Sequence, residues 1–306
     1  MGKIAFVFSG QGAQYSGMGK SLAETSPAAA EVFAAADSIR PGTSEQCFSA
    51  DISQLTVTSN TQPCMFAVEL AVAAALTSAG VRADMAAGFS LGEISALSFS
   101  GAATLQDGFR LVMARGALMQ RDAEAVSAGM AAVLKLDAET VERLCSAYER
   151  VYPVNYNCPG QIAVAGAAEE LTPFCADVKA AGGRAVPLKV AGAFHSPFMA
   201  RAAADFGLEV QKYTLREPDI PLYSNCTALP HTAANFAEML SRQICSPVRW
   251  QSIVENMVAE GVDTFIECGP GKTLCGLIKK TAPGVRTFNV EDAASLQNTI
   301  EGVRGC

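Results

Sequence analysis

The sequence predicts an α/β fold, with a parallel sheet in a large subdomain and a small inserted subdomain of ferredoxin-like order. Two observations support this prediction. Short apolar segments alternate with helical ones over most of the 306 residues, which is typical of parallel sheets. Between residues 125 and 195 the order changes to β-α-β-β-α-β, as in ferredoxin-like domains. We therefore expect residues 1–124 and 196–306 to form the large subdomain and residues 125–195 the small one.

Apolar periodicity and turn residues predict the individual elements. In the large subdomain we expect strands at residues 4–8, 85–87, 222–224, 264–268 and 287–290, and helices at residues 27–39, 62–78, 93–99, 105–123, 234–243 and 250–259. In the small subdomain we expect strands at residues 130–136, 151–156, 161–165 and 184–190, and helices at residues 137–148 and 168–181. Ser26 before Pro27 is typical of a helix start, and Thr104 with Asp107 resembles a capping box.

The segment Gly88–Gly92 has the pattern G-x-S-x-G. A short apolar strand precedes it, and a predicted helix with Gly101 as its C-cap follows. In this setting the glycines permit a sharp turn that exposes the Ser90 hydroxyl at a helix N-terminus, where free N–H groups stabilise negative charge. So short a pattern can also arise by chance, but the strand–turn–helix setting favours a serine nucleophile.

Composition excludes several classes of function. The net charge of −7 and the absence of a basic tract argue against a nucleic-acid partner. No apolar run reaches membrane-spanning length, and the apolar start of the chain is too short for a signal peptide. Ten cysteines without a C-x-x-C pair, with only two histidines, argue against a metal site. We expect a cytoplasmic protein and, from a single compact chain, a monomer.

The loop after the first predicted strand, residues 9–14, contains two glycines. It is not a dinucleotide fingerprint, because the third glycine of G-x-G-x-x-G is replaced by Tyr15. The loop either brings a backbone N–H to the serine as a second oxyanion donor or is an ordinary strand-to-helix turn. This segment alone leaves both interpretations open.

Arg115 lies on an apolar face of its predicted helix, beside Leu111, Leu118 and Met119. A guanidinium in such a position needs a partner. In a structural role it would form an ion pair or extend its charged end to solvent. In a functional role it would bind the carboxylate of a substrate.

A serine nucleophile needs a base, and the chain has two histidines. His195 lies at the junction of the two subdomains, where clefts form, whereas His231 is predicted to be a polar loop residue; we therefore favour His195. The insertion between Ser90 and His195 offers no obvious buried acid, unlike the serine, acid, histidine order of α/β-hydrolases. A helix-end carbonyl near residues 243–247 is an alternative partner for the histidine.

Together these motifs resemble the malonyl-CoA:acyl carrier protein transacylase family over nearly the whole chain. The matching segments are GQGAQ at 10–14, GFSLGE at 88–93, MARGALMQ at 113–120, NCPGQ at 157–161, GAFH at 192–195, QICSPVRW at 243–250 and ECGPGKTL at 267–274. The resemblance implies a hydrolase-like parallel-sheet core with a ferredoxin-like insertion. It also implies ping-pong transfer of a malonyl group from malonyl-CoA to an acyl carrier protein, without a metal or redox cofactor.

The resemblance also implies roles for single residues. These are Ser90 as nucleophile, His195 as base, the Gln243 backbone carbonyl as the group that orients the histidine, the Gln11 and Leu91 N–H groups as the oxyanion hole, and Arg115, Phe194 and Asn157 as substrate-binding residues. One position departs from the family, because Phe89 stands where a histidine often precedes the serine. The GAFH segment resembles the His-Ala-Phe-His of malonyl-selective relatives more than the Tyr-Ala-Ser-His of methylmalonyl-selective ones.

Two other functions remain open at this point. A serine esterase or thioesterase would use the same elbow and release free acid without a thiol acceptor. A non-catalytic carrier-docking subunit would form no acyl adduct, although the joint presence of Ser90, His195 and Arg115 argues against it. The sequence leaves open whether the pathway is fatty acid or polyketide synthesis.

Overall fold

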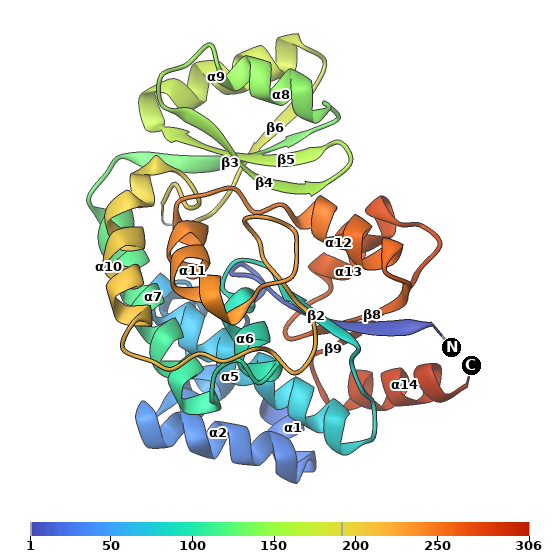
Figure 1. The fold of residues 1–306 in the computed structure, drawn as a ribbon. Coiled ribbons are helices and arrows are strands. Elements are labelled where there is room, and N and C mark those ends of the chain that lie inside the picture. The colour runs from blue at the N-terminus through green and yellow to red at the C-terminus, as the bar shows by residue number, and fades with distance from the viewer. Residues whose placement is uncertain (1, 191, 306) are drawn as a thin grey trace.

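The computed structural model describes residues 2–190 and 192–305, which fold into two subdomains, each with its own sheet (Figure 1). The larger sheet contains β1 (Lys3–Phe8), β2 (Met85–Gly88), β7 (Leu222–Tyr223), β8 (Val262–Cys268) and β9 (Arg286–Val290). The smaller sheet contains β3 (Ala128–Leu134), β4 (Val151–Cys158), β5 (Gln161–Ala167) and β6 (Arg184–Pro187). The predicted α/β class with an inserted small subdomain is confirmed.

The five strands of the larger sheet are all parallel and have the order β7-β2-β1-β8-β9. At the carboxyl end of the central strand, Phe8 pairs with Gly88 of β2 and with Cys268 of β8. The loops that follow these three strands therefore begin at one edge of the sheet, which is where open parallel sheets bind ligands.

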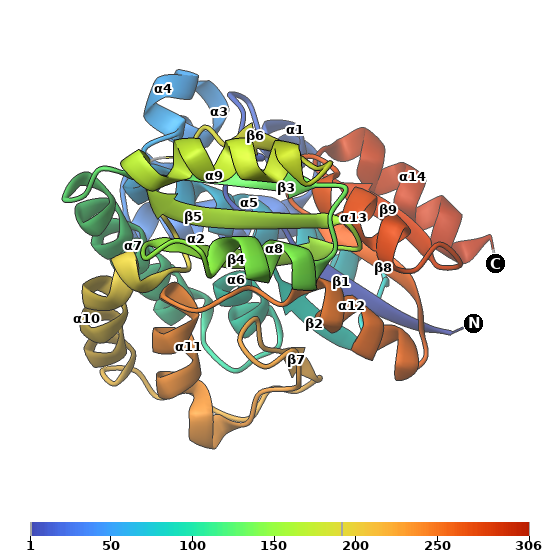
Figure 2. The same ribbon diagram turned by 90° about the horizontal axis from the view of Figure 1, so that it is seen from above.

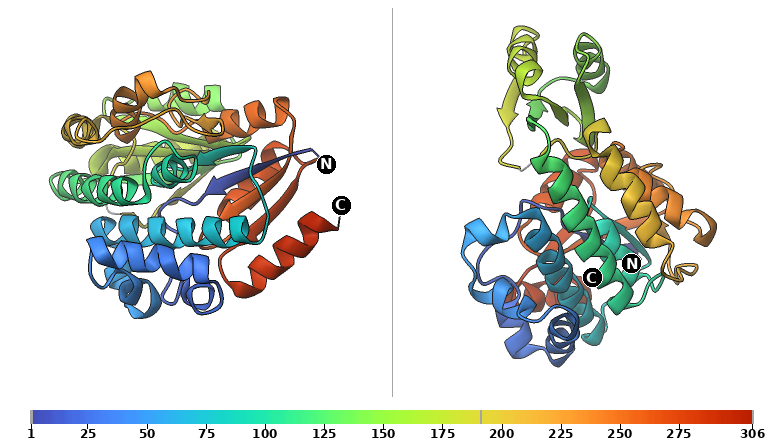
Figure 3. Two further views of the ribbon diagram at one scale, coloured as in Figure 1. Left: turned by 60° about the horizontal axis from the view of Figure 1, so that its bottom comes forward. Right: turned by 90° about the vertical axis from the view of Figure 1, so that its left-hand side faces the viewer.

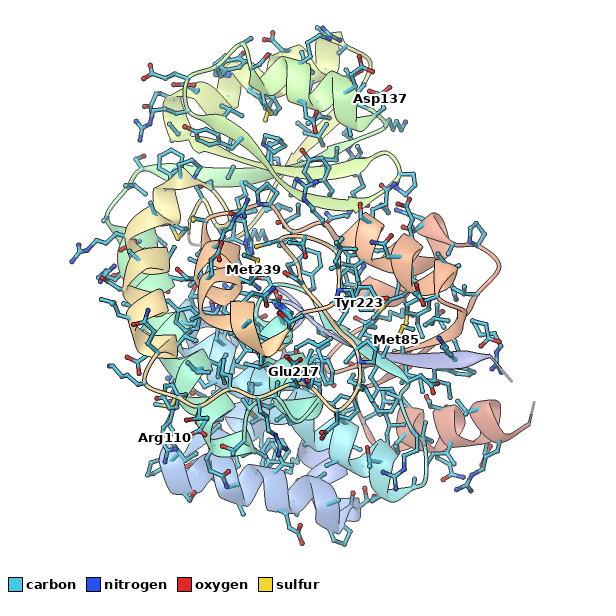
Figure 4. The ribbon with its side chains drawn as sticks, in the orientation of Figure 1. Met85, Arg110, Asp137, Glu217, Tyr223 and Met239 are labelled. Atoms are coloured by element: carbon cyan, nitrogen blue, oxygen red, sulfur yellow. The ribbon has the colours of Figure 1, made fainter. Side chains whose placement is uncertain are left out.

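The smaller sheet is antiparallel, with the order β4-β5-β3-β6. Helices α8 (Ala138–Cys145) and α9 (Ala168–Ala180) cover its outer face, as the view from above shows (Figure 2). This strand order and the chain order β3-α8-β4-β5-α9-β6 confirm the ferredoxin-like prediction. Asp137 begins α8 by accepting a hydrogen bond from the Thr140 N–H, and it lies on the side far from the parallel sheet (Figure 4).

Alternate residues of β1 divide the core of the large subdomain into two layers. Phe6 and Phe8 face one cluster, whereas Ala5 and Val7 face the other. The first layer contains residues of α1 (Lys20–Thr25), α2 (Pro27–Ile39), α3 (Thr43–Ser49), α4 (Ile52–Leu55), α5 (Thr58–Ser78), α6 (Gly92–Phe99), α7 (Leu105–Glu124), η1 (Pro197–Met199), α10 (Ala200–Val210), α11 (Phe236–Ile244) and α14 (Ala293–Arg304). The second contains α12 (Trp250–Ala259) and α13 (Thr273–Thr281). The short helix η2 (Ala233–Asn235) has no buried residue.

Helix α5 runs through the middle of the first layer, between α2 and α7 (Figure 3). It begins at Thr58, four residues before the predicted start. The Thr58 N–H donates to the Gln120 side chain of α7 over 2.9 Å, so a distant residue satisfies a helix-start donor that the local sequence leaves free. Within the described ranges, no helix is long and apolar enough to cross a membrane.

Candidate active site

The turn between β2 and α6 holds Ser90 in a backbone conformation that few non-glycine residues adopt, with φ at 56°. The backbone of neighbouring residues lies so close to both flanking positions that neither has room for a side chain. A Cβ added at Gly88 would lie 1.9 Å from the Gly92 carbonyl group, and one at Gly92 would lie 2.4 Å from the Phe8 carbonyl oxygen. The G-x-S-x-G pattern therefore has a steric cause, and the structure forms the predicted sharp turn between a strand and a helix with Ser90 at its centre.

Ser90 and His195, which are 105 residues apart in sequence, form a hydrogen-bonded pair. Ser90 Oγ lies 2.7 Å from His195 Nε2, and His195 Nδ1 lies 2.8 Å from the backbone carbonyl oxygen of Gln243. Because a carbonyl oxygen only accepts, Nδ1 carries the proton and Nε2 is free to accept the Ser90 proton. Gln243 lies in the last turn of α11, where backbone carbonyls lack helical partners.

The His195 ring is buried, and this burial lowers its pKa to about 4. The nearby Arg115 guanidinium acts in the same direction, whereas the hydrogen bond to the Gln243 carbonyl opposes it. Burial disfavours the charged imidazolium. At neutral pH the ring is therefore uncharged and able to accept a proton.

This lowered pKa predicts the pH dependence of the reaction. Since protonation removes the base, kcat/KM should stay level as the pH falls through 6.5 and should decline only towards pH 4. Arg115→Ala should move that decline to higher pH, because it removes a positive charge near the ring. The measurement is the pH profile with a substrate that has no carboxylate, so that the variant differs from the wild type only in the charge near the ring. A wild-type midpoint at or above 6.5 would contradict the burial argument.

Arg115 is fully buried beside the nucleophile. Its NH2 group donates to Ser90 Oγ over 3.2 Å and to the Gln243 side-chain oxygen over 2.7 Å, and its NH1 group donates to Gln62 over 3.0 Å. Its Nε–H is buried without a partner. Burial lowers the pKa of Arg115 to about 10, so it remains charged at neutral pH.

These contacts decide between the interpretations of Arg115. Its burial excludes extension to solvent, and none of the ion pairs among the described residues includes it. Its side-chain partners are two neutral amides and a hydroxyl. The site thus presents a cation without a directly paired anion next to the nucleophile, which fits an anionic substrate.

Two adjoining cavities lead to Ser90. The inner one has a volume of about 100 Å³, and its walls include Gln11, Leu91 and Phe194. The outer one, of about 270 Å³, lies between the two subdomains and is lined in part by Asn157. The structure therefore places seven of the predicted site residues at or near the nucleophile and Asn157 farther out. Of the hydrogen bonds in the described ranges, none uses the Gln11 or Leu91 N–H, so both donors are available.

Phe89 lines both cavities, and its ring packs against Trp250 with a centroid distance of 5.7 Å. The same ring explains the glycine at position 10, because a Cβ there would lie 2.8 Å from Phe89 Cδ1. The departure from the family's histidine thus places an apolar wall at the junction of the two cavities.

The buried surroundings of two charged or polar residues were not indicated by the sequence. His231 lies in a loop as predicted, but it is buried, and its Nε2 lies 2.6 Å from Oε1 of Glu93. No aspartate or glutamate among the described residues of the insertion is buried, as expected, but Glu93, outside the insertion and three residues after Ser90, is fully buried. Because 138 residues separate Glu93 from His231, no local spacing could indicate this pair.

Asn225 is a further site residue that the sequence did not indicate. Its side-chain oxygen accepts from the Ser90 N–H over 2.8 Å, and its side-chain nitrogen donates to the Gly88 carbonyl over 2.6 Å. Asn225 therefore connects both sides of the elbow turn and supports its strained backbone. Its only sequence signal is its position just after the strand that becomes β7.

The comparisons with known proteins agree with this geometry. The sequence model of the family described as "Acyl transferase domain" matches residues 5–303. The malonyl CoA-acyl carrier protein transacylase of Bacillus subtilis is 38% identical and is aligned over 99% of this chain and 98% of its own. The chain therefore belongs to the acyl transferase domain family, and within it to the malonyl CoA-acyl carrier protein transacylases.

Solved structures extend the likeness to three dimensions. The transacylase of the same name from Clostridium perfringens has a TM-score of 0.95 at 37% identity, covering 99% of this chain and 98% of that one. A malonyl-transacylase in complex with its type II PKS acyl-carrier protein has a TM-score of 0.94 at 33% identity, covering 98% of this chain and 99% of that one. The predicted fold and family are confirmed.

Proposed function

We propose that the chain transfers a malonyl group from malonyl-CoA to the phosphopantetheine thiol of an acyl carrier protein, through an acyl-enzyme on Ser90. One observation carries the proposal: Ser90 Oγ lies 2.7 Å from a neutral histidine and 3.2 Å from a buried arginine. The first group supplies the base for acyl transfer and the second attracts a carboxylate. The names of the relatives support the same substrate and acceptor.

The reaction proceeds in two balanced halves. His195 Nε2 takes the Ser90 proton as Oγ attacks the thioester carbonyl, and the N–H groups of Gln11 and Leu91 stabilise the oxyanion. The intermediate collapses, the C–S bond breaks, and coenzyme A leaves as a thiol with the proton from His195. The carrier's thiol then gives its proton to His195 and attacks the malonyl ester. The ester C–O bond breaks, and the proton on His195 returns Ser90 to its hydroxyl form. No step requires a metal or redox cofactor.

In this proposal Arg115 binds the free carboxylate of the malonyl group. Gln62 and Gln243 fix its guanidinium from two sides, and its unpartnered Nε–H remains as a donor. Phe194 in the wall of the inner cavity limits space at the α-carbon, which favours malonyl over branched acyl groups.

The outer cavity suits the pantetheine arm that both substrates share. Asn155 and Asn157 of β4 line it, and each has a buried side-chain oxygen without a partner. Such oxygens can accept hydrogen bonds from the amide N–H groups of the arm. We therefore assign Asn157 to binding of the arm rather than of the malonyl group.

Replacing Arg115 should separate malonyl from acetyl transfer. Truncating one partner of a buried charged pair costs about 2–5 kcal/mol, which is about 30- to 5,000-fold in kcat/KM. Arg115→Ala should lower malonyl transfer by this range, while acetyl transfer stays level or rises because the mutant has no unpaired cation to reject it. The measurement is kcat/KM for both thioesters. An equal loss on both would show that Arg115 is structural.

Product analysis tests the proposal against its rivals. Incubation with malonyl-CoA and a holo acyl carrier protein should yield malonyl-carrier, with little free malonate. A serine esterase or thioesterase would release malonate at the same rate with or without the carrier. A non-catalytic docking subunit would consume no malonyl-CoA.

We further propose that the protein acts in the cytoplasm as a monomer. All nine cysteines in the described part of the chain are unpaired, which fits a reducing compartment. The residues assigned to catalysis and to substrate binding all come from one chain, so the proposed chemistry needs no second copy. Light scattering at working concentration measures the oligomeric state directly.

A further inference from the structure

Three hydrogen-bond donors converge on the buried carboxylate of Glu93, at the start of α6. Its Oε1 accepts from His231 Nε2 over 2.6 Å and from the Asn225 backbone N–H over 3.2 Å. Its Oε2 accepts from Gln243 Nε2 over 2.8 Å. An ionised carboxylate only accepts and can satisfy all three donors, whereas a carboxamide must turn its own NH2 towards one side.

The contact with Gln243 fixes which way that side chain points. Its Nε2 donates to Glu93 and also to the Ser90 carbonyl over 2.7 Å, so its Oε1 faces Arg115 and accepts from NH2 over 2.7 Å. A flipped carboxamide would place its NH2 against the guanidinium, which has only donors. The acid at position 93 therefore acts on Arg115 without touching it.

We propose that Glu93 is a positioning residue that sets malonyl selectivity by fixing the Gln243 carboxamide and, through it, the Arg115 guanidinium. The inference rests on the proposed function, since it assumes that Arg115 binds the malonyl carboxylate. It goes beyond the proposed function because it makes selectivity depend on a residue outside the substrate cavities. Neither the inner nor the outer cavity is lined by Glu93.

Glu93→Gln tests the proposal, because it keeps the size of the side chain and removes its acceptor-only character. Loss of a hydrogen bond to a charged group lowers an equilibrium constant by about tenfold or more. Malonyl kcat/KM should therefore fall by about tenfold or more, mainly through a higher KM, while acetyl transfer changes by less than about threefold. An unchanged malonyl-to-acetyl ratio, or an equal loss on both thioesters, would overturn the proposal.

Glu69→Gln is the matched control. Glu69 is also fully buried and accepts from Ser95 of α6, but it contacts neither Gln243 nor Arg115. Burial raises its pKa well above the usual range, so a neutral amide resembles its native state. Both activities of this variant should match the wild type. A fall in its malonyl-to-acetyl ratio equal to that of Glu93→Gln would also overturn the proposal.

If Glu93→Gln does not fold, Glu93→Asp provides the same test. The shorter carboxylate cannot reach both Gln243 and His231, so the malonyl-to-acetyl ratio should again fall, and an unchanged ratio overturns the proposal. Failure of the proposed function gives a different pattern, with no malonyl adduct on the wild type. If the wild type is acylated and Arg115→Ala loses selectivity but both Glu93 variants keep it, only this inference fails.

Discussion

Replacing Ser90 with alanine should abolish malonyl transfer, with a loss of roughly a millionfold, as for other histidine-activated serines. The mutation removes the oxygen that lies 2.7 Å from His195 Nε2 and 3.2 Å from Arg115. Without Oγ, no acyl-enzyme can form, and His195 has no nucleophile to activate. The measurement is the rate of malonyl-carrier formation, with circular dichroism to confirm that the variant is folded.

Ser95→Ala is the control for this experiment. Ser95 is also buried and lies on the same helix α6, but its Oγ donates to Glu69 rather than to the dyad. This variant should transfer malonyl at close to the wild-type rate. Full activity in Ser90→Ala, or an equal loss in the two variants, would require a different nucleophile.

Replacing His195 with alanine should slow acylation by about 10²–10⁴-fold, which is the range of general-base assistance. The ring's Nε2 lies 2.7 Å from Ser90 Oγ and can take its proton, and the Gln243 carbonyl holds the ring in the correct tautomer. Stopped-flow measurement of coenzyme A release isolates the acylation step from later ones.

His231→Gln provides the comparison for the histidine test. The glutamine amide can still donate to Glu93, and His231 itself does not contact Ser90. Acylation by this variant should stay within about tenfold of the wild type. If His231→Gln were acylated more slowly than His195→Ala, the assignment of the base to His195 would be wrong.

The parts of the site that could be predicted from the sequence are those with local physical causes. The elbow could be predicted because Gly88 and Gly92 are required by backbone contacts within and beside the same turn. The small subdomain could be predicted because its βαββαβ order lies in one continuous stretch. Arg115 could be identified as unusual because its apolar neighbours are three and four residues away on one helix.

The remaining parts depend on residues far apart in the chain. The Glu93 pairings with Asn225 and His231 span 132 and 138 residues, so neither residue type nor spacing could indicate them. The start of α5 at Thr58 has the same cause, since Gln120 supplies the acceptor from 62 residues away. Pro63 within that helix instead favours a later start, because proline is common in the first turn.

The functional class therefore follows from local motifs, whereas the selectivity that we propose depends on a buried polar network. Buried hydrogen-bond networks can rigidify a site and specify one arrangement of its side chains. In this network Gln243 has two separate roles: its backbone carbonyl orients His195, and its side chain holds Arg115. Because every residue at position 243 retains the backbone carbonyl, a substitution there should affect selectivity more than catalysis.

The most direct test of the central claim is the intact mass of the protein after a short incubation with malonyl-CoA and no acceptor. The account predicts a mass increase of one malonyl group, located on Ser90 by peptide mapping and lost when holo acyl carrier protein is added. The Ser90→Ala variant should show no increase. An unmodified wild-type protein, or a malonyl group on another residue, would contradict the account.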